Sequence, residues 1–188
     1  NNCSGKHTAM LAHARMRDLP LDNYLDPDHP VQRDILAAFA WMCRLSVEQV
    51  ELGTDGCSAP NFAVPLYNAA LGFARMCDPR DLPEERAQAC RKITSAMCAF
   101  PEMASGYGEF DEQLMKAGNG KIITKRGAEG YQIVGLLLGR NLPAGVERRE
   151  RQHEDLVRAG LLGGHGEPAR VRRDRPLYAV GQGRRLAS

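Results

Sequence analysis

The stretch KIITKRGAEGYQIVGLLL, residues 121–138, decides the fold class, because it holds the two β-strand patterns of the chain. Residues 121–124 and 131–138 are short apolar runs, and Gly127 and Gly130 flank a turn between them. Upstream, the spacing of apolar residues predicts helices over residues 5–17, 31–45, 62–77, 83–99 and 109–117. Many helices with few strands predict a helix-rich α/β (α+β) chain.

Length and composition are those of a soluble globular protein. Of the 188 residues, 43% are hydrophobic and 26% are charged, while only 6% are aromatic, so we expect an aliphatic core. No apolar run approaches the roughly 18–20 residues that a membrane helix needs, and no signal-peptide pattern is visible. We therefore expect a cytoplasmic protein with no membrane partner.

Charge divides the chain near Gly135. Residues 1–135 contain 14 basic and 17 acidic residues, whereas residues 136–188 contain 11 arginines and 6 acidic residues. The second segment is rich in Gly and Arg and weak in apolar periodicity, so we expect a domain over 1–135 and a divergent tail over 136–188, either disordered or frame-shifted. Its arginines would attract phosphates, but without a binding motif or aromatics beyond Tyr178 a nucleic-acid partner is not favoured.

The six cysteines fall into two groups, and none of them forms a C-x-x-C pair. Four lie within helical patterns and are expected to be small buried hydrophobic residues; they are Cys43, Cys77, Cys90 and Cys98. Cys3 and Cys57 lie outside such patterns. The sequence also starts at Asn1 without a preceding strand or helix, which is typical of an internal segment, so we expect an N-terminally truncated domain.

Cys3 and Lys6 are three residues apart where a helix is predicted to begin, so their side chains project from one face of its first turn. The unpaired N–H groups at a helix start, together with Lys6, would stabilise a thiolate at Cys3. The same field disfavours a cation, so we expect a lowered pKa for Lys6, whose neutral amine could donate a lone pair. Cys3 is thus a candidate metal ligand or nucleophile.

Two further segments carry reactive groups. The loop from Gly53 to Pro60 presents the carboxylate of Asp55 and the thiol of Cys57, and two of its residues are glycines. Lys125 ends the first predicted strand, a common place for a catalytic lysine. Other groups are less informative: Gly5-Lys6 lacks most of a phosphate-loop motif, and we interpret His7 and His13 as surface or hydrogen-bonded residues.

Six short motifs in a fixed order are together more specific than any one of them. They are Asn2-Cys3-Ser4-Gly5-Lys6-His7, Asp28-His29-Pro30-Val31-Gln32, Gly53-Thr54-Asp55-Gly56-Cys57 with Pro60, Pro65-Leu66, Pro101-Glu102-Met103-Ala104-Ser105-Gly106 and Lys125-Arg126-Gly127-Ala128-Glu129-Gly130. Over residues 1–135 they resemble the bacterial asparaginase II family, of the inducible rhizobial type. The resemblance implies a C-terminal portion of a fold similar to serine β-lactamases and glutaminases, with an incomplete antiparallel sheet.

The resemblance also implies a reaction and a site. Members hydrolyse L-asparagine to L-aspartate and ammonia and form homodimers, so L-asparagine and a second copy are the expected partners. Carried over onto matching positions, the family's residues imply one zinc ion per chain, bound by Cys3, Lys6 and Cys57. In the same way Asp55 and Asn2 are implied to lie next to the metal or the substrate, and Lys125 to be catalytic.

Two departures from the family pattern are visible. Family members carry an S-x-x-K motif, whose serine forms an acyl-enzyme, upstream of the position that matches Asn1, and this chain has no such motif. Phe100 also replaces the histidine of the family's His-Pro-Glu. An alternative interpretation is therefore a non-catalytic structural or interaction module in which zinc joins two loops.

Overall fold

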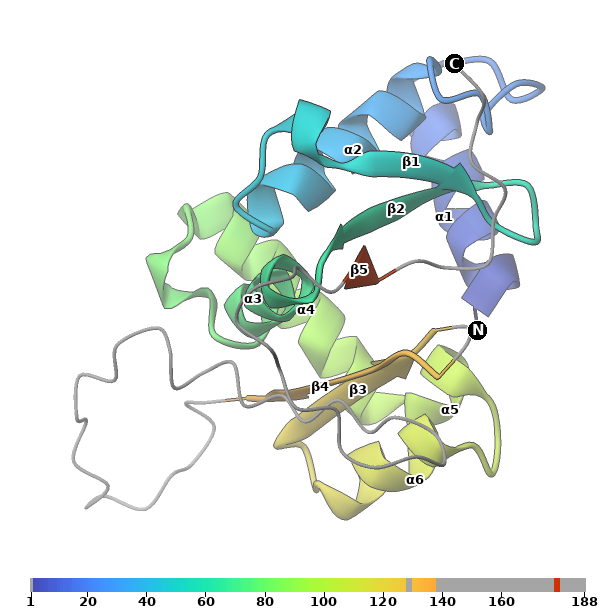
Figure 1. Cartoon of the computed structure of the whole chain (residues 1–188). Helices are drawn as coiled ribbons and strands as arrows, with labels where there is room; N and C mark the ends of the chain where they lie inside the picture. Colours follow the sequence, from blue (N-terminus) through green and yellow to red (C-terminus); the bar gives the residue numbers. More distant parts are fainter. Residues whose placement is uncertain (1, 128–129, 138–177, 180–188) are drawn as a thin grey trace. The chain divides into compact units, whose positions relative to one another are not determined.

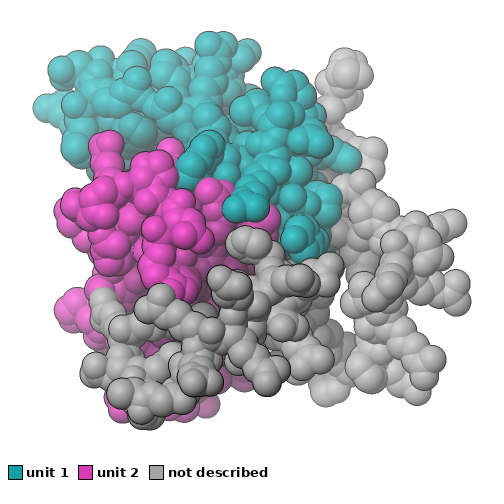
Figure 2. Space-filling view, turned by 90° about the vertical axis from the view of Figure 1, so that its left-hand side faces the viewer, with its two compact units in different colours: residues 1–69, 172–188 teal, residues 70–171 magenta. Residues whose placement is uncertain are grey.

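A computed structural model describes residues 2–127, 130–137 and 178–179. They divide into two compact units, drawn in different colours in Figure 2. The first holds residues 2–69 and 178–179, and the second holds residues 70–127 and 130–137. The predicted helix-rich α+β class is confirmed. Most of the expected tail, residues 138–177 and 180–188, lies outside the described residues, so its assignment stays a prediction.

The first unit combines two helices with a small antiparallel sheet (Figure 1). Its elements are α1 (Asn2–Met16), α2 (Pro30–Met42), the short 3-10 helix Val47–Gln49, β1 (Glu51–Thr54), β2 (Pro60–Pro65) and β5 (Tyr178–Ala179). The sheet order is β1-β2-β5. Thr54 lies opposite Pro60 and Glu51 opposite Ala63, so β1 and β2 form a hairpin closed by the loop 55–59.

Sequence signals explain where α2 begins. Pro30 is its first residue, a position at which the missing N–H group costs no hydrogen bond. His29 caps the helix, because its Nδ1 accepts a hydrogen bond of 3.2 Å from the Val31 N–H group. The other ring nitrogen of His29 lies 3.1 Å from the Pro20 carbonyl oxygen, which ties the cap to the preceding loop.

Two clusters of apolar side chains hold this unit together. In the first, Met10 and Ala14 of α1 pack against Val31 of α2 and Ala59 of the hairpin loop. In the second, α2 packs against the sheet; its buried members are Ala40, Val50 and Val64. Helix α1 is therefore held against α2 and against the loop that joins β1 to β2, which determines where its first turn lies.

The helix predicted over residues 62–77 is wrong in its first part. Residues Pro60–Pro65 form β2, and α3 begins only at Leu66 and ends at Cys77. The strand β1 was not predicted at all. An apolar run of four to six residues has no periodicity that separates a buried strand from a helix, so the run 62–65 was merged with the helix that follows.

The second unit packs helices against a β-hairpin. Its elements are α3 from residue 70 onward, the 3-10 helix Pro79–Asp81, α4 (Glu84–Ala99), α5 (Pro101–Ser105), α6 (Phe110–Ala117), β3 (Ile122–Arg126) and β4 (Gln132–Leu136). The predicted strands 121–124 and 131–138 thus pair as an antiparallel hairpin, with Lys125 opposite Ile133. The prediction of an incomplete antiparallel sheet agrees with this small hairpin and the β1-β2-β5 sheet.

Ile123 is the centre of the second core. It is fully buried among Cys77 of α3, Met115 of α6 and Leu137. Gly135 of β4 allows α3 to approach closely, because a Cβ atom there would overlap the sulfur of Cys77 and approach the Phe73 ring to 2.9 Å. The hairpin and α3 are therefore in tight contact inside this unit.

The predicted burial of four cysteines is confirmed for Cys43, Cys77 and Cys90, whereas Cys98 is only half-buried. Burial raises the pKa of Cys77 to about 12, so this thiol is inert at neutral pH. Among the residues that the structure describes, no helix is both long enough and apolar enough to cross a membrane.

Replacing Ile123 with Ala is expected to lower the free energy of unfolding by about 2–5 kcal/mol, because the missing atoms leave a cavity in a tightly packed core. Urea denaturation measures the change. The matched control is Leu136→Ala on the paired strand, where the side chain is 60% exposed and the loss should stay within about 1 kcal/mol. Equal losses in the two variants would contradict the position of this core.

Candidate metal centre

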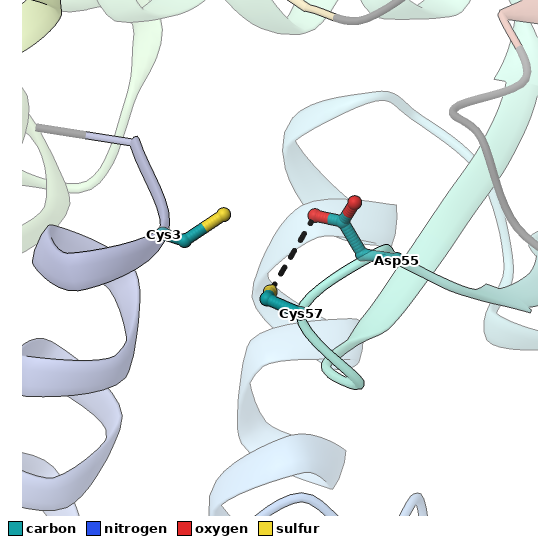
Figure 3. Close-up of side chains that lie close together, drawn as sticks. All are labelled: Cys3, Asp55 and Cys57. Atoms are coloured by element: carbon teal, nitrogen blue, oxygen red, sulfur yellow. Dashed lines mark hydrogen bonds between the residues drawn. The ribbon is translucent and has the colours of Figure 1, made fainter.

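Three ligand-type side chains converge in the first unit. The Sγ atoms of Cys3 and Cys57 and a carboxylate oxygen of Asp55 all lie within 4.8 Å of one another. Figure 3 shows that the Cys3 sulfur, at the start of α1, points toward the hairpin loop that carries Asp55 and Cys57. The structure therefore brings together two of the three predicted zinc ligands and the residue predicted to lie beside them.

The register of α1 places Cys3 toward the hairpin loop. Cys3, His7, Met10 and Ala14 follow the spacing of one helix face. Met10 and Ala14 are buried against Val31, so the continuation of this face toward the helix start carries Cys3, with Lys6 and His7 one turn further on. The core thus orients the reactive first turn of α1.

The hairpin loop is held by its own hydrogen bonds. The N–H group of Asp55 donates to the Ala59 carbonyl oxygen at 2.8 Å, and that of Ser58 donates to the Asp55 carbonyl oxygen at 2.9 Å. Ser58 has a φ of 68°, a left-handed conformation that favours glycine, whereas neither Gly53 nor Gly56 has a positive φ. The left-handed residue of this chain reversal is therefore Ser58, and not Gly53 or Gly56.

Lys6 joins the cluster through Asp55. Its ammonium group forms a short ion pair with Oδ2 of Asp55, and the two side chains are 32% and 31% exposed. Oδ2 also lies 3.8 Å from the Cys57 sulfur (Figure 3). Lys6, Asp55 and Cys57 thus share one set of contacts, and all three sequence-predicted metal ligands lie in one place.

The charge state expected for Lys6 is wrong for this arrangement. Burial lowers the pKa of Lys6, but its hydrogen bonds to Asp55 and Cys57 outweigh burial and raise it above its ordinary value. In turn, the hydrogen bond from Lys6 lowers the pKa of Asp55. Here Lys6 is an ammonium group, because the fold pairs it with the carboxylate of Asp55, which is 49 residues away in the sequence.

The more acidic thiol is Cys57 and not Cys3. Burial raises the pKa of Cys57, but hydrogen bonds from His7, the Ala59 backbone, Lys6 and Cys3 lower it to about 7. The pKa of Cys3 is raised, mainly by its hydrogen bond to Cys57. Cys3 therefore acts as a donor to a Cys57 thiolate, and the expected stabilisation of a Cys3 thiolate by the helix start is outweighed.

His7 and Tyr24 belong to this site, although we predicted only a surface position or a hydrogen bond for His7 and no role for Tyr24. Nδ1 of His7 lies 2.6 Å from the hydroxyl of Tyr24, and the two rings meet edge to face. His7 also hydrogen-bonds to Cys57. The signal that could have found His7 is its spacing of four residues from Cys3 on the same helix face.

The other two predicted site residues, Asn2 and Lys125, are not members of the Cys3, Asp55 and Cys57 cluster. Asn2 is exposed on the first turn of α1, and its proposed contact with substrate stays a prediction. Lys125 belongs to the second unit, where it is half-buried near the end of β3 and donates a 2.9 Å hydrogen bond to the Arg126 carbonyl oxygen. Burial lowers the pKa of Lys125. Phe100 caps α5 and is 58% exposed.

Thiols, a carboxylate and lysine amines are the groups that hydrolytic enzymes and metal-binding proteins use. The family profile of L-asparaginase II matches residues 1–147, and the chain belongs to this family. Membership points to an asparaginase-type amidohydrolase with a small-molecule substrate. The match extends beyond residue 135, where we placed the end of the resemblance. A search of curated proteins gave no match.

Proposed function

We propose that this chain is part of an enzyme that hydrolyses the side-chain amide of L-asparagine to L-aspartate and ammonia. Its membership of the L-asparaginase II family supports the reaction class. The observation that carries the proposal is the convergence of Cys3, Asp55 and Cys57, with Lys6 bound to Asp55, at positions that match the family's site motifs.

The cluster fits a zinc ion by its chemistry. Two Zn–S bonds of about 2.3 Å in tetrahedral geometry hold their sulfurs roughly 3.8 Å apart, and the two sulfurs here lie within 4.8 Å of each other. Cys57, with a pKa of about 7, is readily deprotonated. Cys3, Cys57 and Lys6 would hold the ion, which would supply positive charge and an open coordination position for water or substrate.

Lys6 and Asp55 have linked roles in this proposal. Lys6 is an ammonium group while it is paired with Asp55, so it must lose a proton before its nitrogen can bind a metal. Asp55 accepts hydrogen bonds from Lys6 and from the Gly56 N–H group, the latter at 2.7 Å. Asp55 therefore holds the lysine nitrogen near the two sulfurs, and in this proposal it also accepts a hydrogen bond from the substrate's amino group.

The chemical step that we propose is acyl transfer through a serine. As the serine oxygen attacks the amide carbon, its proton passes to the neighbouring lysine of S-x-x-K and from there to the amide nitrogen, so that the C–N bond breaks and ammonia leaves. Water then hydrolyses the ester to L-aspartate, and a proton returns to the serine oxygen. Within this chain, Ser4 and Ser58 are followed three residues later by His7 and Asn61, so neither supplies the motif. The nucleophile is proposed to lie in a segment upstream of Asn1 in a longer protein.

Ammonia release from L-asparagine tests the proposal. We expect none from the 188-residue chain and turnover from an extended protein, defined as this chain preceded by the upstream segment that contains S-x-x-K. Changing the serine of that motif to Ala in the extended protein should abolish turnover. Activity of the short chain would overturn the position of the nucleophile. An extended protein that binds zinc but releases no ammonia would favour the non-catalytic zinc module.

A further inference from the structure

We propose that Asp111 is the positioning residue for Lys125, and that its buried carboxylate fixes the strand segment from which this lysine projects. The proposal rests on the proposed function, because the resemblance to the asparaginase II family implies that Lys125 is a catalytic lysine of that reaction. Asp111 lies in the first turn of α6, and Lys125 lies on β3, which packs against that helix in the same unit.

Asp111 is a carboxylate with no exposed surface, and its partners are all hydrogen-bond donors. Oδ2 accepts the backbone N–H group of Arg126 at 2.8 Å, and Oδ1 accepts the side-chain amide of Gln132 at 2.7 Å. The Thr124 hydroxyl has one hydrogen to donate and two acceptors within reach, Oδ1 at 3.3 Å and the Ile133 carbonyl oxygen at 2.9 Å. A buried charge is costly unless donors surround it, and here they do.

These contacts bracket Lys125. Thr124 precedes it, Arg126 follows it, and Gln132 lies opposite Arg126 on β4. Side chains alternate along a strand, so the fully buried Thr124 faces Asp111 while Lys125 projects from the other side of β3. Asp111 therefore binds β3 on the face opposite the Lys125 side chain, and it fixes both the direction of that side chain and the register of the hairpin.

Only a carboxylate satisfies this arrangement in full. The amide of Gln132 donates one hydrogen to Asp111 and the other to the Thr124 hydroxyl oxygen at 2.5 Å. The Arg126 N–H group belongs to the backbone of β3, so its direction is fixed and it always points its hydrogen at Asp111. In an Asp111→Asn variant, one carboxylate oxygen becomes an NH₂ group that faces a donor. The variant keeps the shape of the side chain and loses both a hydrogen bond and the negative charge.

The charge also acts on Lys125. Burial lowers the pKa of Lys125, Asp111 counteracts that effect, and the neighbouring Arg126 adds to it. Arg126 is itself paired with Glu109 at 2.7 Å, so the charged groups described around Lys125 are Asp111, Arg126 and Glu109. Loss of the Asp111 charge should therefore lower the pKa of Lys125 further, a change that a merely structural residue would not produce.

The matched control is Glu112→Gln, one residue along α6. Glu112 is also buried, but its oxygens accept from the Gly108 N–H group at 2.6 Å and from Lys116 at 2.7 Å, both within α6 and the turn before it. Glu112→Gln removes a buried charge from the same helix turn without touching β3. It should cost stability and leave the titration of Lys125 where it is in the unaltered chain.

The experiment follows the Lys125 side-chain NMR signal against pH in the 188-residue chain, assigned among its five lysines by its loss in Lys125→Met. We expect Asp111→Asn to lower the pKa of Lys125 and Glu112→Gln to leave it unchanged. In the extended protein, Asp111→Asn should lower kcat by about 10–100-fold with a smaller change in KM, as a displaced reactive group does. Equal titration of Lys125 in Asp111→Asn and the unaltered chain would overturn the proposal.

A second variant covers the case in which Asp111→Asn does not fold. Gln132→Met removes one hydrogen bond to the Asp111 carboxylate and leaves the Asp111 charge in place. It should therefore change the chemical shift of the Lys125 side-chain signal, and an unchanged chemical shift overturns the proposal. The NMR result does not depend on turnover. If the extended protein with Lys125→Met kept full activity, the catalytic role of Lys125 would fail, while the link from Asp111 to Lys125 would still be decided by the titration.

Discussion

Replacing Cys57 with Ala is expected to remove zinc from the protein. The unaltered chain should bind close to one zinc ion per molecule, and the variant should lose more than the roughly 10–100-fold in affinity that the loss of an outer partner of a metal ligand costs. The physical reason is that Cys57 has the more acidic thiol of the cluster, is hydrogen-bonded to Lys6 and lies 3.8 Å from Oδ2 of Asp55. Metal analysis after equilibration with a competing chelator measures the change.

Cys90→Ala is the control for the loss of a thiol as such. Cys90 is buried in α4 of the second unit, and burial raises its pKa, so the variant should keep its zinc. Cys3→Ala should behave like Cys57→Ala. Full zinc occupancy in either variant of the cluster would contradict the assignment of these thiols as ligands.

Lys125→Met in the extended protein is expected to lower kcat by about 10²–10⁴-fold, the range that a positioned proton donor or acceptor contributes. Met keeps the apolar stem that is half-buried at the end of β3 and removes the amine. Steady-state ammonia release measures the effect, and the unfolding midpoint shows that the hairpin is intact.

Lys121→Met separates a specific role of Lys125 from a general loss of positive charge. Lys121 is exposed immediately before β3, and its backbone makes two hydrogen bonds: its N–H group donates to the Gly118 carbonyl oxygen at 2.9 Å, and its carbonyl oxygen accepts from the Leu137 N–H group at 2.8 Å. The Lys121 variant should keep kcat within about twofold. If both lysine variants lost activity equally, the effect would be electrostatic attraction of the substrate and not catalysis by Lys125.

Much of the second unit could be predicted from local sequence. The expected helices 83–99 and 109–117 correspond to Glu84–Ala99 and Phe110–Ala117, because Pro83 and a long apolar period mark the first, and acidic residues and Gly118 bound the second. The two apolar runs on either side of the turn 127–130 predicted two strands, and these pair as the β3–β4 hairpin. Each of these signals lies inside the element that it predicts or directly beside it.

The sheet of the first unit could not be predicted in the same way. Strand β1 has four residues and includes Gly53, and β2 runs directly into α3 at Leu66. Neither strand is stable alone; each is defined by pairing across the 55–59 loop and by packing of Val64 on α2. These strands are defined by contacts between residues that are distant in the sequence, and the spacing of apolar residues along the chain does not predict such contacts.

The site shows the same limit. The spacing of Cys3 and Lys6, and the position of Asp55 and Cys57 in one loop, follow from local sequence. The charge states do not, because the pKa of Lys6 depends on Asp55 and that of Cys57 depends on His7, partners brought near by the fold. Local sequence therefore predicted which groups could act together, whereas the expected stabilisation of a Cys3 thiolate is outweighed by the hydrogen bond of Cys3 to Cys57.

The two halves of the cluster lie far apart in the chain, Cys3 on the first turn of α1 and Cys57 on the hairpin loop. A zinc ion held by both thiols would act as a cross-link that closes a loop of about 55 residues, and in the chain-entropy model such a closure is worth about 4 kcal/mol against the unfolded chain. The metal would thus hold α1 against the loop between β1 and β2. Chelation should release α1 before it unfolds the second unit.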